Sequence, residues 1–348
     1  MIIIAGFGNP LLDITVKINS KHILQKYNLK DDDQSEIPDA TMKSLLEDIK
    51  DLPMEYNPGG CVQNTLRIFQ WLCGTSGMTY MIGVTGIDKN GEILKTLVEN
   101  DGVQTRYGLN KELHTGLTVA LINKENRSLV ASIGAAKEIT IDSLQKITNY
   151  DELLDTVDLI YMEGFFIPNR EGCAKHILTF AKNKQKLFGF NISAPYICQE
   201  NTSTIQYFTE NCNILFGNLK EYESLIQSIG FQGKVVDFAL YLNKTYVQEC
   251  WKYRKIIVIT NGSKKVTCIH SEGNVIHYQV PKLYAREIVD TTGAGDSFVA
   301  GFILGILKNL SPDICLKYGC WAAQQIIKQI GCKIPCYLPD IDINVKKL

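Results

Sequence analysis

The chain has 348 residues, and its 45% hydrophobic and 21% charged residues are typical of a globular protein. Its 36 basic and 37 acidic residues nearly cancel, which argues against a nucleic-acid partner and against a polybasic membrane protein. The 11 cysteines are scattered without a CxxC pair, so we expect reduced thiols and no structural zinc site.

Short apolar runs alternate with helical patterns along most of the chain. The first run has no basic segment before it, so it predicts a strand rather than an export signal, and we expect a cytoplasmic protein. The longest strongly apolar window, 298–307, is far shorter than the ~20 residues that a membrane span needs. The alternation indicates an α/β fold with a mostly parallel sheet flanked by helices, in which ligands bind beyond the carboxyl ends of the strands. The predicted strands are 1–8, 79–84, 158–166, 186–192, 213–218 and 255–260, and the predicted helices are about 61–73, 91–100, 171–183, 219–228, 297–308 and 312–329.

Two segments depart from this alternation and then return to it. Residues 14–57 are polar, and residues 105–137 have the pattern of a β-meander. We expect these two segments to form a small β-rich lid domain. Residues 1–13, 58–104 and 138–348 would then form a large α/β catalytic domain.

The stretch VDTTGAGDSFVAGF (289–302) places small residues directly before a predicted helix. Gly293, Ala294 and Gly295 let the backbone approach a ligand closely, and the unpaired N–H groups of a first helical turn attract anions. Beside such an anion site, Asp296 would suit a general base that takes a proton from a hydroxyl group. Together these features are typical of phosphoryl transfer to an alcohol. The residues alone leave open that Asp296 is a helix cap and the glycines an ordinary tight turn.

No GxxxxGK[ST] and no complete GxGxxG is present, so neither a P-loop nor a dinucleotide fingerprint is supported. The stretch DTTGAGDSFVAGF instead resembles the second signature of the ribokinase-like (phosphofructokinase-B) carbohydrate kinases. Further stretches, in one order from residue 6 to 335, resemble the adenosine-phosphorylating branch of that family. They are GFGNPLLDI (6–14), YNPGGCVQNTLRIFQWL (56–72), GVTGIDKNGEIL (83–94), NRSLVASIGAA (126–136), GFFIP (164–168), NISAPYI (191–197), ILFGNLKEYE (214–223) and GCKIP (331–335).

The resemblance implies a ribokinase-like, Rossmann-like fold and ATP-dependent phosphorylation of the adenosine 5′-hydroxyl, giving AMP and ADP in purine salvage. Adenosine, ATP and Mg²⁺ are the implied partners, with no nucleic acid and no membrane, and we expect a monomer. The implied catalytic residues are Asp296 as the base, Gly293, Ala294 and Gly295 as the anion hole, and Arg127 as a lid arginine on the transferring phosphates. The implied adenosine-binding residues are Asn9, Asp13, Gln34, Gly59, Gly60, Cys61, Asn64, Leu129, Ala131 and Phe166. The implied nucleotide-binding residues are Asn191, Asn218, Glu221, Thr260, Gly262 and Thr292, with Mg²⁺ held through water near Asn218 and Glu221.

Alternatives remain for several of these residues and for the function. Asn9 and Asp13 also suit a turn around a proline, Asn64 a solvent-facing helix position, and Phe166 the core. Another ribokinase-like nucleoside or sugar kinase, and a non-catalytic nucleoside-binding protein, are the alternative functions. Three positions depart from the common family pattern, and two of them lie on the ATP side. The sequence therefore specifies the phosphate donor less well than the phosphate acceptor. They are Cys61 in place of Ser, Thr292 in place of Asn and Cys320 in place of His.

Overall fold

The computed structural model describes residues 1–18, 20–30, 34–123, 126–245 and 255–341. Within these residues the main layer is a nine-stranded sheet of order β14-β13-β12-β11-β10-β9-β1-β5-β6. The seven strands from β12 to β6 pair in parallel, and β13 and β14 add an antiparallel edge. The mostly parallel sheet and the six predicted strands are therefore confirmed, except that residues 164–166 of the predicted strand 158–166 form a 3-10 turn. The strands are β1 (Ile2–Phe7), β5 (Gly77–Gly86), β6 (Gln104–Asn110), β9 (Leu159–Glu163), β10 (Leu187–Asn191), β11 (Ile214–Asn218), β12 (Ile256–Thr260), β13 (Lys265–His270) and β14 (Asn274–Gln279).

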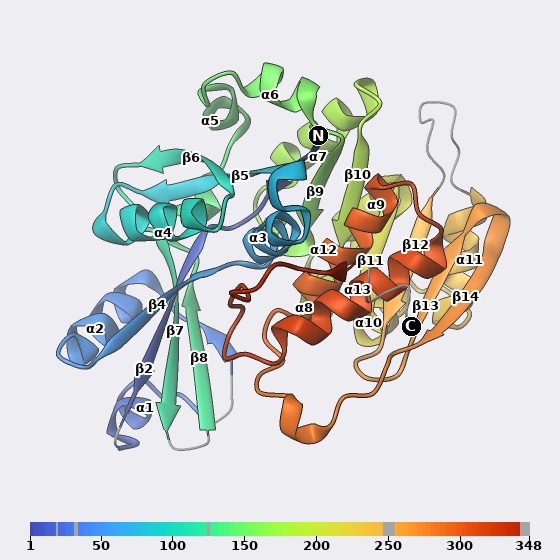
Figure 1. Cartoon of the computed structure of the whole chain (residues 1–348). Coiled ribbons are helices and arrows are strands. Elements are labelled where there is room, and N and C mark those ends of the chain that lie inside the picture. Colours follow the sequence, from blue (N-terminus) through green and yellow to red (C-terminus); the bar gives the residue numbers. More distant parts are fainter. Residues whose placement is uncertain (19, 31–33, 124–125, 246–254, 342–348) are drawn as a thin grey trace.

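Helices cover both faces of this sheet, because side chains of a strand point alternately to its two faces (Figure 1). In β9, Leu159 and Tyr161 pack into one core cluster, whereas Ile160 and Met162 pack into the other. The first cluster also contains α3, α4, α12 and α13, and the second contains α6 to α11. The helices are α1 (His22–Lys26), α2 (Asp39–Ile49), α3 (Cys61–Cys73), α4 (Lys89–Asn100), α5 (Ile141–Gln145), α6 (Tyr150–Thr156), α7 (Glu171–Asn183), α8 (Pro195–Glu200), α9 (Thr202–Asn211), α10 (Leu219–Ser228), α11 (Val235–Thr245), α12 (Ala294–Leu307) and α13 (Pro312–Ile326).

A second sheet of five strands, order β3-β8-β7-β2-β4, lies beside the first and is seen at the lower left of Figure 1. Side chains of α1 and α2 share one apolar cluster with Leu12, Ile14 and Val16 of β2, so these helices cover one face of this sheet. The alternate residues of β2, Asp13 among them, are half-buried and lie on the opposite face. The strands are β2 (Leu11–Lys17), β3 (Gln34–Glu36), β4 (Met54–Gly59), β7 (Gly116–Asn123) and β8 (Asn126–Ser132).

One part of the predicted β-meander lies in the other sheet. Residues 104–110 form β6, which pairs in parallel with β5 of the large sheet, whereas β7 and β8 form the expected antiparallel pair. The helix α4 makes the crossover between β5 and β6, so this strand completes one more β-α-β unit. Strand β2 also begins at Leu11, before the predicted boundary at residue 14. We therefore keep the lid as a proposal, and apply it to the five-stranded sheet with α1 and α2.

No helix in the described ranges is long and apolar enough to cross a lipid bilayer. The ten cysteines in those ranges are all free thiols, as expected for reduced side chains that pack as small hydrophobes, whereas Cys250 lies outside the described residues.

Helix α12 is held against α13 by a close backbone contact. A Cβ atom at Gly301 would overlap the carbonyl oxygen of Tyr318 in α13, so the two helices can approach this closely only with glycine at that position. Asp296 lies in the first turn of α12. The packing of α12 on α13 therefore places the carboxylate that the sequence singles out.

We predict that Gly301→Ala destabilises the protein by about 1–3 kcal/mol, since an added methyl group must push the two helices apart. Gly172→Ala in α7 is the matched control, because a Cβ there has no neighbouring atom within 4 Å. The control should be neutral or slightly stabilising, since alanine favours a helix over glycine. Urea unfolding of both variants measures the difference, and equal stabilities would contradict the assigned helix contact.

Candidate active site

Polar side chains gather at the carboxyl ends of neighbouring strands of the large sheet. Asn191, Asn218 and Thr260 are the last residues of β10, β11 and β12. Glu163 ends β9 and lies opposite Asn191 in the strand register, as Asn218 lies opposite Thr260. The register therefore places these residues at one edge of the sheet, and the predicted roles of Asn191, Asn218 and Thr260 stay predictions.

The glycine turn before α12 has the geometry of a ligand-facing helix start. Gly293 is the N-cap with φ 77°, a left-handed conformation that favours glycine, and no side chain caps this helix. The alternative that Asp296 is an ordinary helix cap is therefore wrong. No atom lies within 4 Å of a Cβ built on Gly295, so the turn faces open space on that side. In this conformation the N–H of Ala294 donates to the carbonyl oxygen of Thr291 at 3.2 Å, so an anion at this turn would have to compete for that donor, whereas the other N–H groups of a first helical turn are typical anion partners.

The carboxylate of Asp296 is half-buried next to this turn and accepts a hydrogen bond from Nδ2 of Asn64 at 3.1 Å. Asn64 is only 6% exposed, so the alternative of a solvent-facing helix residue is also wrong. Enclosure by the protein raises the pKa of Asp296 to about 7, an effect opposed by the hydrogen bond from Asn64 and reinforced by the charge of Asp13. A carboxyl group with this pKa can be ionised near neutral pH and still be basic enough to take a proton.

Asp13 reaches this site from the second sheet. Its carboxylate lies against Gly59 of β4, where a Cβ atom would overlap the carboxylate oxygens. The next residue, Gly60, has φ 87°, and a Cβ there would overlap the carbonyl oxygen of Asn9. These close approaches bring the start of α3, with Cys61 as its first residue, next to the start of β2.

Asn9 is held on both sides by the protein itself. Its Nδ2 donates to the carbonyl of Phe165 at 3.1 Å, and its Oδ1 accepts from Nη1 of Arg170 at 2.7 Å. Arg170 is 6% exposed, also donates to the carbonyl of Ala136, and lies 4.8 Å from the ring centre of Phe166. Asn9 therefore braces the site in this conformation. The sequence analysis missed Arg170, which no motif marks.

The register of the second sheet places the predicted base-binding residues on one face. Ala131 lies in the same row as Asp13, with Thr118 between them, and Leu129 lies two residues before Ala131 on β8. Both side chains are half-buried. Gln34 takes the register position opposite Leu129 on β3. The side chains of Gln34 and Arg127 lie outside the described part of the chain, so their roles stay predictions.

Phe166, one of the implied adenosine-binding residues, is less accessible than the neighbouring Phe165. Phe166 follows β9 in a short 3-10 turn, is 1% exposed and packs in the core, which agrees with its core alternative. The preceding residue, Phe165, is half-buried, and its ring lies 6.3 Å from that of the exposed Tyr196. In this conformation Phe165 and Tyr196 offer more open aromatic surface than Phe166.

Asn218 and Glu221 form a capping box at the start of α10. Glu221 accepts from the backbone N–H and from Nδ2 of Asn218, at 2.8 and 2.5 Å, and its own N–H donates to Oδ1 of Asn218 at 3.0 Å. Burial raises the pKa of Glu221 to about 7. Among the described residues no three His, Cys, Asp or Glu side chains converge as metal ligands. These side chains bind each other, an arrangement that is compatible with holding Mg²⁺ through water, and the role of the pair stays a prediction.

The remaining predicted residues lie in two turns. Thr292 donates from its N–H and its hydroxyl to Oδ1 of Asp290, at 2.9 and 2.7 Å, and the N–H of Gly331 donates to Oδ2 at 2.9 Å. Asp290 thus ties the glycine turn to the 331–335 segment. Gly262 follows β12 with φ 55° and has no atom within 4 Å of a built Cβ, so it leaves open space.

A second buried carboxyl group, Glu163, was missed by the sequence analysis. It is 2% exposed and accepts a hydrogen bond from the hydroxyl of Tyr161 at 2.8 Å. Burial, and after it the charge of Asp296, raises the pKa of Glu163 well above its usual range. Its place as the last residue of an apolar strand was the available signal.

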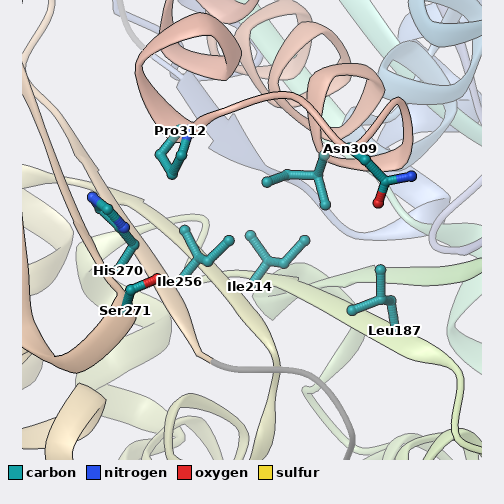
Figure 2. A pocket seen from close by; sticks show the side chains of 8 residues that line it. Leu187, Ile214, Ile256, His270, Ser271, Asn309 and Pro312 are labelled. Atoms are coloured by element: carbon teal, nitrogen blue, oxygen red, sulfur yellow. The ribbon is translucent and has the colours of Figure 1, made fainter.

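A cavity of about 200 Å³ lies elsewhere, lined by Leu187, Ile214, Ile256, His270, Ser271, Ile306, Asn309 and Pro312 (Figure 2). Leu187, Ile214 and Ile256 are the first residues of β10, β11 and β12. This cavity is therefore at the opposite edge of the sheet from the site described above.

Comparison with known proteins places the chain among kinases. Residues 39–340 match the family model of the pfkB family carbohydrate kinases. The chain is 30% identical to adenosine kinase 2 of Arabidopsis thaliana and 29% identical to adenosine kinase of Dictyostelium discoideum, over 96% of this chain and 96% and 97% of those proteins. A crystal structure of Anopheles gambiae adenosine kinase in complex with P1,P4-di(adenosine-5) tetraphosphate has a TM-score of 0.83 at 30% identity, covering 96% of this chain and 98% of that one. Schistosoma mansoni adenosine kinase in complex with 2-fluoroadenosine has a TM-score of 0.81 at 28% identity, covering 95% and 97%.

The raised pKa of Asp296 predicts a pH-dependent stability. Between about pH 4, where an unfolded aspartate titrates, and about pH 7, the folded chain keeps a proton that the unfolded chain has lost. The free energy of unfolding must therefore fall as the pH rises through this window. Asp296→Asn removes the titrating group. The free energy of unfolding of the variant, relative to that of the parent, should therefore increase by on the order of 2 kcal/mol from pH 5 to pH 8.

Urea unfolding at several pH values measures this difference. Asp51→Asn, at an exposed turn position, serves as the control and should follow the parent. A variant Asp296→Asn whose stability runs parallel to that of the parent from pH 5 to pH 8 would show that Asp296 titrates normally.

Proposed function

Because the chain belongs to the pfkB family of carbohydrate kinases, we propose that it transfers the γ-phosphoryl group of ATP to the 5′-hydroxyl of adenosine. The products are AMP and ADP, and the reaction returns the purine nucleoside to the nucleotide pool. The observation that carries the proposal is the half-buried Asp296 beside the open glycine turn at the start of α12. Adenosine kinases that match the chain over almost its whole length support adenosine as the acceptor.

The proposed base is Asp296. Asn64 donates to one carboxylate oxygen, Oδ2, which leaves Oδ1 to accept the proton of the attacking hydroxyl group. The N–H groups of Gly293 and Gly295, and that of Ala294 once it releases the carbonyl oxygen of Thr291, would stabilise the charge that develops on the transferring phosphoryl group. Proton removal and charge stabilisation then occur at one helix terminus.

Adenosine would lie between the two sheets. The carboxylate of Asp13 can accept hydrogen bonds from the two vicinal ribose hydroxyls, and the missing side chains of Gly59 and Gly60 leave room for the sugar. Leu129 and Ala131 offer an apolar surface for one face of the purine, and the ring of Phe165 offers an aromatic one. This arrangement favours a nucleoside over a free sugar.

ATP would bind along the carboxyl ends of β10, β11 and β12. Asn191 and Thr260 suit phosphate contacts, Gly262 a close approach of the nucleotide, and Thr292 the turn beside it. Mg²⁺, when bound with ATP, neutralises phosphate charge, and Asn218 and Glu221 would hold its water ligands. Arg127 is the proposed lid arginine that adds positive charge in the closed state.

The five-stranded sheet with α1 and α2 is the proposed lid. Closure over the substrates would exclude water, which competes with the hydroxyl group as phosphoryl acceptor. A monomeric state and a cytoplasmic location remain predictions from the sequence.

The substrate is tested with a panel of adenosine, inosine, ribose and fructose, with ATP and Mg²⁺, in a coupled assay of ADP release. We expect turnover of adenosine and at most weak turnover of the two sugars, because the sugars cannot contact Leu129, Ala131 and Phe165. Turnover of ribose without turnover of adenosine would reject the proposal in favour of a sugar kinase. Adenosine binding by calorimetry without any ADP release would indicate a non-catalytic nucleoside-binding protein.

The base assignment predicts that Asp296→Asn lowers kcat for adenosine by ~10²–10⁴-fold, the usual contribution of a general base. Adenosine affinity, measured by calorimetry, should barely change, because the amide keeps the shape of the carboxylate. The matched variant Asp13→Ala should give the opposite pattern, with adenosine binding weakened by ~1–3 kcal/mol, since the ribose hydroxyls lose a charged partner. An Asp296→Asn protein that keeps most of its turnover would exclude this residue as the base.

A further inference from the structure

A buried arginine lies directly behind the proposed base. Arg67 of α3 is 3% exposed and follows Asn64 by one helical turn. Its Nη1 donates to Oδ1 of Asn64 at 3.0 Å, and Nδ2 of Asn64 donates to Oδ2 of Asp296 at 3.1 Å. The three side chains therefore form one hydrogen-bonded chain that ends at the base.

The direction of this chain matters because the amide of Asn64 has two possible orientations. In the observed one, an NH₂ group faces the carboxylate of Asp296. Turned by 180°, the amide would direct its carbonyl oxygen at the carboxylate, and the two oxygens would repel each other. The guanidinium of Arg67 can only donate, so it bonds to the carbonyl oxygen and disfavours the turned amide, which would set donor against donor.

Arg67 also supports the glycine turn. The same Nη1 donates to the carbonyl oxygen of Cys332 at 3.1 Å. The sulfur of Cys332 lies 2.5 Å from where a Cβ of Gly293 would be, so this segment packs directly against the turn. One guanidinium thus contacts both the partner of the base and the support of the proposed anion hole.

The guanidinium is itself fixed in place. Its Nε donates to Oδ2 of Asp101 at 2.6 Å, and Nη1 also reaches the carbonyl of Pro58 in β4 at 3.3 Å. Asp101 follows α4 and its side chain is 25% exposed. The ion pair holds the plane of Arg67 in the orientation that its bonds to Asn64 and Cys332 require.

We propose that Arg67 is a positioning residue for the phosphoryl transfer: it holds Asn64 with an N–H donor toward Asp296 and holds Cys332 against the glycine turn. In this proposal Arg67 does not touch the substrate; it acts through these two residues and through its positive charge, which favours the ionised form of Asp296. The inference rests on the proposed function for its kinetic consequences, whereas its effect on Asp296 does not require a substrate.

Arg67→Met in the full chain is the first test. We expect kcat for adenosine to fall by ~10–100-fold, the range expected when a catalytic group is misplaced by a small distance. KM for adenosine should stay within about threefold, because Asp13 and the base-binding face are unchanged. Arg67→Lys keeps the charge and should recover part of the lost kcat. Arg106→Met is the matched control, since this partly buried arginine of β6 donates hydrogen bonds to Thr105 and Gln104 and lies 5.2 Å from the ring centre of Tyr80, away from Asp296, and it should leave kcat unchanged.

A pH profile separates positioning from general loss of structure. Several described titratable side chains interact electrostatically with Asp296. Arg67 is the one cation among them, and its positive charge favours the ionised carboxylate of Asp296. The acid limb of kcat should therefore move to higher pH in Arg67→Met and back toward the parent in Arg67→Lys. The other groups in that set, which are unchanged in these variants, are Asp13 of β2, Cys61 of α3, Tyr161 and Glu163 of β9, and Cys332 before the carboxyl-terminal segment.

The same shift should appear without any substrate, as a change in the pH at which Asp296 affects the free energy of unfolding. If the parent does not phosphorylate adenosine, the proposed function fails, while this stability measurement still tests Arg67. Should Arg67→Met not fold, Arg67→Met/Asp101→Asn removes both charges and leaves no unpaired ion.

A double-mutant cycle completes the test. In an Asn64→Leu background, Arg67→Met should lower kcat by clearly less than in the parent, because most of the effect of Arg67 passes through Asn64. The inference is overturned if a folded Arg67 variant keeps the kcat and the acid limb of the parent. It is also overturned if the loss in the Asn64→Leu background equals the full loss, or if kcat falls without any movement of the acid limb.

Discussion

A carboxylate enclosed by protein beside a helix N-terminus is the constraint on which the rest of this site depends. Enclosure alone would keep Asp296 protonated and useless as a base, whereas several direct donors would lower its pKa and make it a weak one. In this structure the pKa of Asp296 lies between these limits. One N–H from Asn64 and the charge of Arg67 favour the ionised form, while burial and the charge of Asp13 oppose it. The resulting pKa of about 7 for Asp296 suits proton transfer near neutral pH.

This balance is assembled from elements that are distant in sequence. Asn64 and Asp296 are 232 residues apart, yet they touch because α3 and α12 pack side by side on one face of the large sheet. The chain passes from the large sheet to the second sheet between β1 and β2 and returns between β4 and α3; it crosses again between β6 and β7 and returns after β8. The first two passages lie at the site, where Gly60 lies against the carbonyl of Asn9. Two of the connections about which the second sheet could move therefore lie next to the residues that would bind the acceptor.

The sequence predicted most of the fold and the centre of the site, because each of those signals is local. An apolar strand ending in a polar residue marks the edge near Asn191, and small residues before a helix mark the turn before Asp296. The sequence analysis missed residues whose contacts are with distant parts of the chain. Arg67 looks like a polar residue on an amphipathic helix, and only the tertiary structure shows that Asp101 from another helix terminus neutralises it.

Two other differences between the predicted and the observed structure also arise from contacts between distant parts of the chain. The alternation of β9 stops at Glu163 and a 3-10 turn follows, so period-two reasoning cannot tell which of Phe165 and Phe166 faces the core. The pairing of β6 with β5 depends on the crossover through α4, and nothing in residues 104–110 themselves distinguishes the two sheets. The predicted strand 158–166 thus ended three residues too late, and the predicted meander lacked the partner of its first strand.

The edge of the sheet that is proposed to bind ATP carries carboxyl groups, although ATP is itself a polyanion. Glu163 and Glu221 are both buried there, and burial raises the pKa of each, to about 7 for Glu221. Each carboxyl therefore carries less negative charge near neutral pH than an exposed glutamate would, which reduces the repulsion of phosphate. A cation bound through water would reduce it further and would in turn favour the ionised form of Glu221. The same low-dielectric surroundings that make Asp296 basic thus let a site rich in acids accept the most negatively charged of the substrates.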